Sequence, residues 1–221
     1  MLCGTNMTDI KISNRSAILR LLHEAGAMSR KQIAARLKLT PATITVIINE
    51  LMNESILVEG NSVPNAGAVG RREVMVEISR EKYVALGLAL SQGLVKFTVV
   101  NLHGEIIHEE TFKLPEILTP EYFAETIGRQ IQLKIASYGY SENFIIGIGI
   151  TVCGVVDFAN GIILDSDGIW EEKNVPIVKM FRKQFSFPVI AANNVRSYAN
   201  AYAFLQHDSQ LQNMLFIRNE A

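Results

Sequence analysis

The sequence predicts an α/β chain in two parts, a small helical head over residues 1–80 and a larger domain over residues 81–221. Three observations favour this division. Apolar residues recur at helical spacing through residues 14–53, and a stretch rich in Gly, Asn, Pro and Ala follows between two short apolar runs. Beyond Arg80, runs of strand length alternate with helical patterns. With 221 residues, 48% of them hydrophobic, the chain can bury two cores.

The head begins with two predicted helices. From Asn14 the apolar residues keep a helical spacing until Gly26, which we expect to end the first helix. Ser29 then stands three residues before Gln32, and the pair forms a capping box that satisfies backbone N–H groups left unpaired at a helix start. The sequence therefore predicts a second, short helix from Ser29 to about Leu37.

A third helix and a two-stranded wing complete the head. Thr40 suits the cap and Pro41 the first position of a helix that runs to about Asn53, because proline lacks the N–H that would be unpaired there. The apolar residues of this helix fall on one face, at Ile44, Ile47, Ile48 and Leu51. Strand-like runs at 56–59 and 74–78 flank the loop rich in glycine, which predicts a wing.

Three helices and a wing in this order predict a winged helix–turn–helix that binds duplex DNA, because a helix or a two-stranded ribbon fits the major groove. We expect the third helix to read bases, the start of the second helix to hold phosphates, and two arginines after the loop to enter a narrow minor groove. The candidate DNA-binding residues are Ser29, Arg30, Lys31, Thr40, Pro41, Ala42, Thr43, Thr45, Asn49, Arg71 and Arg72.

Beyond residue 80 the patterns of strands and helices alternate. The expected helices are 120–138, 175–184 and 195–205. The expected strands are 84–90, 94–100, 106–112, 145–152, 161–164, 189–192 and 214–217. This alternation predicts an α/β domain.

Composition narrows the partners and the compartment. Residues 1–80 hold ten Lys/Arg against seven Asp/Glu, whereas residues 81–221 hold eleven against fifteen, so the positive charge lies where DNA is expected to bind. Cys3 and Cys153 are far apart and the four histidines lack ligand spacing, which favours a reducing compartment and gives no metal site. No apolar run spans a bilayer and the start does not resemble a signal peptide, so we expect a cytoplasmic protein without a membrane partner.

Several segments resemble the ROK family, which groups sugar-responsive repressors with sugar kinases. In the head they are SRKQIA at 29–34, LTPATIT at 39–45 and GRR at 70–72, and in the body GIGITVCGVVD at 147–157, NG at 160–161 and ANNV at 192–195. The resemblance covers nearly the whole chain and implies, for residues 81–221, the first lobe of an actin-like (ribonuclease-H-like) domain. The second lobe is expected to be absent, so the chain is either a fragment or a truncated product.

The body departs from the family's kinases where their chemistry needs particular residues. Ala89 stands at the Asp of the kinases' D-x-G-G-T phosphate loop, and Ser91 and Gln92 replace glycines of that loop. Asn194 aligns with the catalytic Asp, and an amide cannot accept a proton at neutral pH. The resemblance thus implies no ATP cofactor, no catalytic residue and no phosphoryl transfer. The residues expected to hydrogen-bond a sugar hydroxyl are Asp167, Asn193 and Asn194.

The residues and the resemblance together predict a transcriptional repressor of carbohydrate genes rather than an enzyme. We expect it to bind an inverted-repeat operator as a homodimer and to be released when a sugar or sugar phosphate, xylose among the candidates, biases the body. Two alternatives stay open. One is a sugar kinase with an appended DNA-binding head, and the other is an interaction module whose truncated body no longer dimerises.

Overall fold

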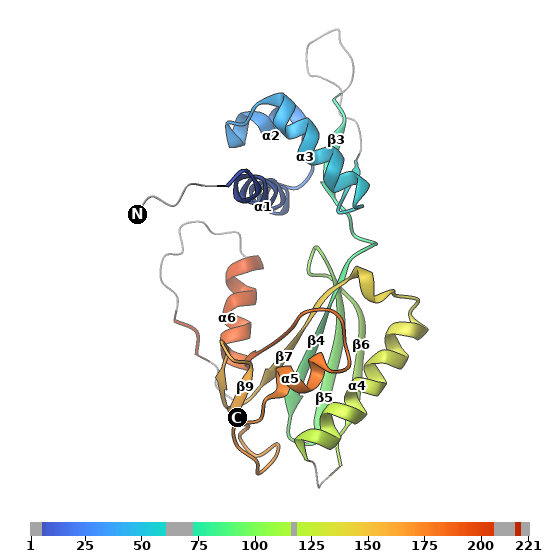
Figure 1. Ribbon diagram of the computed structural model, residues 1–221, viewed down its shortest axis with the longest axis vertical. Coiled ribbons are helices and arrows are strands. Elements are labelled where there is room, and N and C mark those ends of the chain that lie inside the picture. Colours follow the sequence, from blue (N-terminus) through green and yellow to red (C-terminus); the bar gives the residue numbers. More distant parts are fainter. Residues whose placement is uncertain (1–5, 61–72, 116–118, 206–214, 218–221) are drawn as a thin grey trace. The chain divides into compact units, whose positions relative to one another are not determined.

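The computed structural model describes residues 6–60, 73–115, 119–205 and 215–217. The chain divides into two compact units, Met1–Lys82 and Tyr83–Ala221, which we call the head and the body (Figure 1). Among the described residues, no helix combines the length and the apolar character that crossing a bilayer requires.

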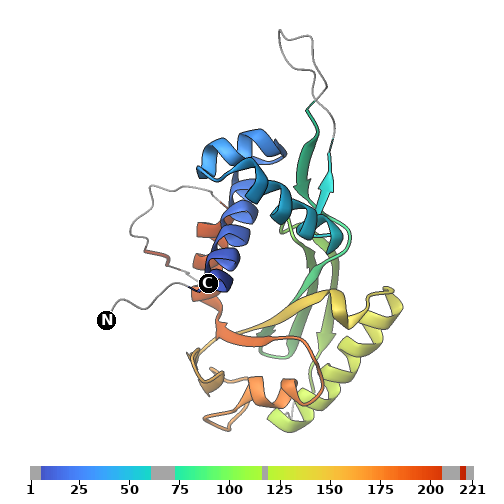
Figure 2. The same cartoon turned by 45° about the horizontal axis from the view of Figure 1, so that its top comes forward.

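Among its described residues, the head contains three helices and a three-stranded antiparallel sheet; Figure 2 shows the helices beside the strands. The sheet order is β1-β3-β2, so β3 pairs with both other strands. The core joins all three helices to the sheet through Ile18, Leu22, Ile33, Ile44, Ile48, Leu51, Leu57 and Val76. The elements are α1 (Met7–Ala25), β1 (Met28–Ser29), α2 (Arg30–Leu37), α3 (Pro41–Asn53), β2 (Leu57–Glu59) and β3 (Met75–Ile78).

The helix α1 starts seven residues before the predicted Asn14, and contacts distant in sequence explain why. Lys11 Nζ lies 2.7 Å from a carboxylate oxygen of Glu50 on α3. One turn later the Arg15 guanidinium donates to both carboxylate oxygens of Glu54, at 3.0 and 2.6 Å. These ion pairs hold the polar first turns of α1 against α3, whereas apolar spacing marks only the later turns.

The body is built on a five-stranded sheet with the order β10-β7-β4-β5-β6. The strands β10, β7 and β4 run parallel, and β4, β5 and β6 form an antiparallel meander. A small hairpin of β8 and β9 follows β7. The strands are β4 (Val84–Ser91), β5 (Leu94–Asn101), β6 (Ile106–Lys113), β7 (Ile145–Val152), β8 (Val155–Asp157), β9 (Ile162–Asp165) and β10 (Val189–Asn193).

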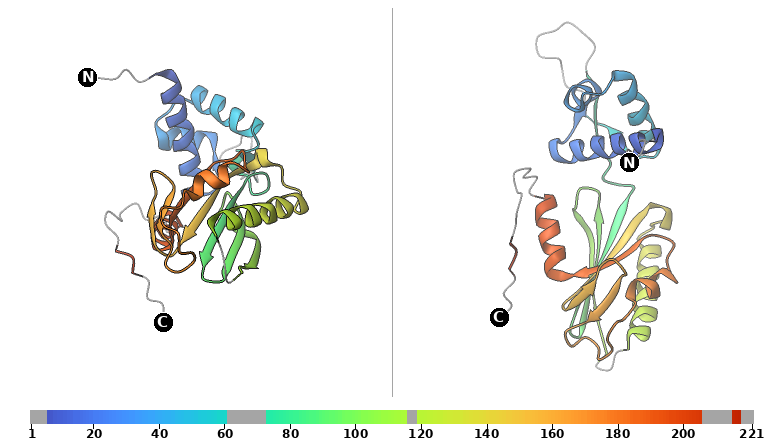
Figure 3. Two further views of the ribbon diagram at one scale, coloured as in Figure 1. Left: turned by 60° about the horizontal axis from the view of Figure 1, so that its bottom comes forward. Right: turned by 60° about the vertical axis from the view of Figure 1, so that its left-hand side comes forward.

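Helices lie on both faces of this sheet. The α4 (Pro120–Ser137) and α5 (Ile177–Arg182) helices cover one face, and α6 (Asn194–Leu205) lies on the other (Figure 3). A short 3-10 turn, η1 (Glu142–Phe144), precedes β7. Along β4, the large buried side chains alternate with the small residues Ala85, Gly87 and Ala89. Of these small residues, Ala89 lines the pocket described below.

Two strand expectations differ from the structure. Residues 215–217 have no regular secondary structure, and Leu215 and Ile217 are 85% and 77% exposed, so the strand expected at 214–217 is wrong for the residues described. An apolar run forms a strand only where a neighbouring edge supplies hydrogen bonds. The expected strand at 161–164 does form, as β9, but it pairs with β8, which the patterns did not indicate.

Candidate DNA-reading surface and ligand pocket

Local capping fixes where α2 and α3 begin. Ser29 Oγ accepts from the N–H of Gln32 (3.3 Å) while Gln32 Oε1 accepts from the N–H of Ser29 (2.8 Å), which confirms the predicted capping box. Lys38 ends α2 in the left-handed region (φ 53°), and Thr40 Oγ1 accepts from the N–H of Thr43 (3.2 Å) at the start of α3. The starts of α2 and α3, on either side of the turn, are therefore fixed by hydrogen bonds between neighbouring residues of the head.

The α3 helix has one buried face and one exposed face. Its predicted apolar residues are all buried, with Ile44, Ile48 and Leu51 at 0% exposure. On the opposite side, residues spaced by four, three and four positions form an exposed line along the helix. We call this line the α3 stripe, and its members are Ala42, Val46, Asn49 and Asn53.

The threonine hydroxyls of α3 are hydrogen-bonded within the head. Thr45 Oγ1 donates to the carbonyl of Pro41 at 2.8 Å. The Oγ1 atoms of Thr40 and Thr43 share a hydrogen bond, also at 2.8 Å. A threonine can present either its hydroxyl or its methyl group to a base, and these bonds favour the methyl groups.

Arg30 links the start of α2 to the α3 stripe. Its Nη2 donates to Asn49 Oδ1 at 3.0 Å and lies 3.5 Å from Met52 Sδ. This bond leaves the amide NH₂ of Asn49 as the donor that the stripe offers. Lys31, beside Arg30, is exposed and suited to a phosphate.

Ser29 and the arginine pair stand apart from the other residues expected to touch DNA. Ser29 is only 3% exposed, and its N–H and Oγ both serve the capping box, so its role is to place Arg30 and Lys31 rather than to touch DNA. Arg71 and Arg72 lie outside the described residues.

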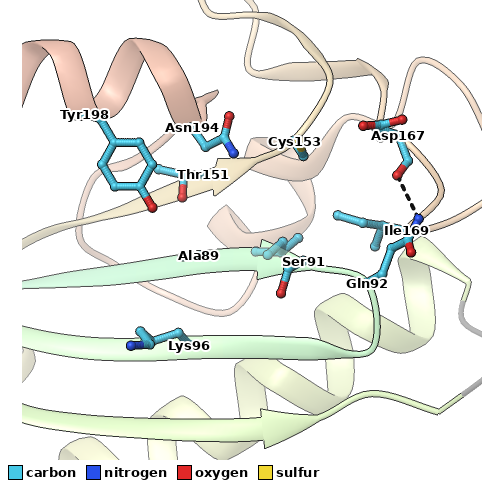
Figure 4. Close-up of a pocket in the computed structure, with 11 residues that line it drawn as sticks. Ala89, Ser91, Gln92, Lys96, Thr151, Cys153, Asp167, Ile169, Asn194 and Tyr198 are labelled. Atoms are coloured by element: carbon cyan, nitrogen blue, oxygen red, sulfur yellow. Dashed lines mark hydrogen bonds between the residues drawn. The ribbon is translucent and has the colours of Figure 1, made fainter. Parts of the chain in front are cut away.

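The body has a pocket of about 580 Å³ on the face of the sheet where α6 lies (Figure 4). Three neighbouring strands supply its floor, since Ala89 of β4 pairs with Lys96 of β5 on one side and Thr151 of β7 on the other. Asn194 and Tyr198, one turn apart on α6, line it as well. The other lining residues are Leu90, Ser91, Gln92, Cys153, Asp167 and Ile169.

The loop that carries Asp167 is anchored from two sides. Asp167 has a left-handed backbone (φ 48°), and its N–H donates to Asp165 Oδ1 at 3.2 Å. Its carbonyl accepts from Gln92 Nε2 at 3.4 Å, drawn as the dashed line in Figure 4. A hydrogen bond from Lys173 (3.0 Å), followed by the one from the Asp167 N–H, holds the pKa of Asp165 below its ordinary value. An ionised Asp165 thus keeps Asp167 at the pocket.

The adjacent asparagines have different roles. Asn194 lines the pocket. Asn193 does not: its Nδ2 donates to the carbonyl of Gly154 at 2.6 Å, and its Oδ1 accepts from the N–H groups of Val195 (2.9 Å) and Arg196 (3.3 Å). Asn193 therefore caps α6 and ties it to the segment after β7, and its expected contact with a sugar is replaced by this positioning role.

The packing of the fold determines which further residues line the pocket of the body. Trp170, the single tryptophan, is 7% exposed and packs on Phe123 with ring centroids 5.6 Å apart, so it belongs to the core. Sequence reasoning missed Lys96, Thr151 and Tyr198. The spacing of Tyr198 four residues after Asn194 was a usable signal, whereas the other two become neighbours only through strand register. Within the described residues, no cluster of His, Cys, Asp and Glu could hold a metal ion.

Together, the fold and the two surfaces define a class of protein, a winged helix–turn–helix DNA-binding head followed by an α/β lobe of the actin-like type. Comparison with known families agrees. A winged helix-turn-helix DNA-binding family matches residues 13–58, and the ROK family matches residues 86–219. The chain belongs to the ROK family.

Similar proteins include transcriptional regulators, one of them a xylose repressor. The chain is 26% identical over 213 residues to the DNA-binding transcriptional dual regulator NagC of Escherichia coli K12, covering 96% of this chain and 52% of NagC. It is 25% identical over 195 residues to the xylose repressor of Caldicellulosiruptor bescii, covering 88% and 48%. A solved ROK family transcriptional regulator, a homologue of E. coli Mlc, superposes with a TM-score of 0.72 at 25% identity, covering 88% and 48%. The chain spans about half the length of these relatives.

Proposed function

We propose that this chain acts as a repressor of carbohydrate genes that binds an inverted-repeat operator in the cytoplasm as a homodimer. The observation that carries the proposal is the capped α2–turn–α3 unit, which buries one face of α3 and exposes the α3 stripe beside Arg30 and Lys31. A helix presented in this way fits the major groove while the flanking cations meet phosphates. Similarity to NagC and to the xylose repressor, which extends over head and body together, supports it.

The effector in this proposal is a sugar or sugar phosphate bound in the pocket of the body. Asp167 and Asn194 line it with a carboxylate and an amide, groups that accept from and donate to sugar hydroxyls. Lys96 adds a cation, although it also lies 3.2 Å from Glu109. Binding there favours one state of the body and releases the operator.

The DNA-binding test is fluorescence anisotropy on duplexes from the region upstream of the chain's own gene, at several salt concentrations. Lys31→Ala should make the slope of log affinity against log salt shallower by about two, because each protomer of the homodimer loses the cation that neutralises one phosphate. The matched control is Lys179→Ala, an exposed lysine of the body, which should leave the slope unchanged. The double change Arg71→Ala/Arg72→Ala should weaken binding by about 1–3 kcal/mol for each arginine that enters a groove. Equal affinity for a random duplex would refute the proposal.

The effector test titrates xylose, glucose, N-acetylglucosamine and their phosphates into the DNA complex. We expect one of them to release the duplex, and Asn194→Ala to abolish that release without weakening DNA binding. Asn160→Ala, at an exposed turn of the body, is the control. Release that survives Asn194→Ala would place the effector elsewhere.

A second candidate function, sugar phosphorylation, has one observation in its favour, because the Asp167 carboxylate lines the same pocket. Against it, Ala89 and Asn194 line the pocket at the positions where the family's kinases carry aspartates. An assay of ATP-dependent phosphorylation on the same sugars decides between them. Phosphate transfer that disappears in Asp167→Asn would establish the kinase instead.

A further inference from the structure

The α3 helix lacks the residues that usually read guanine. Its sequence, PATITVIINELMN, contains no arginine and no lysine. Guanine presents two acceptors in the major groove, and a bidentate Arg or Lys is the commonest side chain to meet them. A reading helix without cations therefore favours base edges other than the paired acceptors of guanine.

The leading half of the α3 stripe is apolar and exposed. Val46 is 57% exposed, and Ala42 lies one turn before it on the same line. Both line an open groove of about 540 Å³ between α1 and α3, with Ile10 (47% exposed) on the α1 side. Thr43 also lines this groove, and its hydroxyl is already hydrogen-bonded to that of Thr40.

We propose, resting on the DNA-binding function proposed above, that α3 reads thymine through its C5-methyl groups, which Ala42 and Val46 contact in the major groove. The methyl of thymine is the apolar group that the major groove presents, so it is the base feature that matches this surface. Asn49 continues the reading one turn later with the NH₂ that Arg30 leaves outward, a donor for adenine N7 or thymine O4. The half-site under the first two turns of α3 is therefore rich in A·T pairs.

The flanks of the apolar surface favour DNA over a second copy of the chain. Arg30 and Lys31 lie at the start of α2, and Arg30 contacts the stripe itself through Asn49. The stripe ends in the amides of Asn49 and Asn53. A cationic and amide border suits a polyanion whose groove carries isolated methyl groups, whereas an isologous self-contact would bring this cationic border against its own copy.

The experiment replaces thymine by deoxyuridine, which removes only the methyl group. The duplex is one bound specifically by the full chain and located by footprinting, and each thymine of a half-site is replaced in turn. The affinity should fall roughly four-fold at each contacted position, which corresponds to the free energy of burying one methyl group. Val46→Ala should weaken binding to the thymine duplex and should lose sensitivity to deoxyuridine at one position. Ile12→Ala, another exposed aliphatic residue, on α1, should retain full sensitivity.

Three other outcomes would overturn the proposal, each for a different reason. Equal affinity for the thymine and deoxyuridine duplexes would overturn methyl reading while leaving specific DNA binding intact. The absence of specific binding to any upstream duplex would refute the DNA-binding function, and this proposal would fall with it. A change in sedimentation of Val46→Ala without DNA would show that the surface is a contact between copies, which also overturns the proposal.

Discussion

Removal of the Asn193 side chain should destabilise the body while leaving its pocket residues chemically intact. Asn193→Ala deletes the cap of α6, which accepts from the N–H groups of Val195 and Arg196, and the donor to the Gly154 carbonyl. A missing cap costs about 1 kcal/mol, and the missing hydrogen bond about as much again. We therefore expect the free energy of unfolding to fall by about 2 kcal/mol. Asn193→Asp retains the acceptor but not the donor, so it should show about half of that effect.

The assay is urea unfolding followed by tryptophan fluorescence. Trp170 is the only tryptophan of the chain and is buried in the body, so its emission reports the unfolding of the body separately from the head. With a slope of about 2 kcal/mol per molar urea, Asn193→Ala should lower the midpoint by about 1 M. The control is Asn200→Ala, an exposed asparagine further along α6, because Asn194 Oδ1 itself accepts from the Val195 N–H (2.8 Å). A urea midpoint no lower for Asn193→Ala than for this control would refute the stabilising role of the Asn193 side chain.

Three further predictions concern capping, charge and backbone. Thr40→Val should cost the head about 1 kcal/mol and speed amide exchange at the start of α3, because it removes the cap oxygen; unchanged exchange would count against it. Arg15 holds the pKa of Glu54 below its ordinary value, so this carboxylate stabilises the head above the ordinary pKa and the contribution is lost as pH falls through the lowered one. Because the Glu54 carboxylate is exposed, the pair contributes less than about 1 kcal/mol. Glu54→Gln should therefore make the acid-induced loss of helical circular dichroism slightly less steep, and an unchanged acid profile would count against this role. Gly154→Ala should unfold the body, since its φ is 129° and a Cβ would meet the Asp165 carbonyl; a native Trp170 emission spectrum would contradict this.

The elements that the sequence predicted best are those with local signals. Thr40 and Pro41 marked the start of α3, Gly26 the end of α1, and the run 145–152 is β7 itself. The early turns of α1 escaped because their contact, Lys11 with Glu50, joins residues 39 positions apart. The two-residue strand β1 escaped because its only signal is its pairing with β3. Local patterns carry no information about such partners.

The candidate site was predictable in part. The reading helix and its exposed residues followed from helical periodicity, because the buried face of α3 was visible as isoleucines at the right spacing. The choice between Asn193 and Asn194 was not, since adjacent residues of identical chemistry differ only in which one meets the Gly154 carbonyl. Likewise, Lys96 and Thr151 become neighbours only when β4 brings its two partner strands into register. Sheet register is a property of the whole fold.

Through its central position in the sheet of the head, β3 connects the wing directly to the start of α2. Ser29 is at once the ladder partner of Met75 on β3 and the residue that caps α2. The β1–β3 ladder has two residue pairs, Met28 with Val76 and Ser29 with Met75, and no loop separates it from the first turn of α2. The wing strand β3 is therefore connected directly to the helix start that carries Arg30 and Lys31. A displacement of β3 would change how these two cations are presented to DNA.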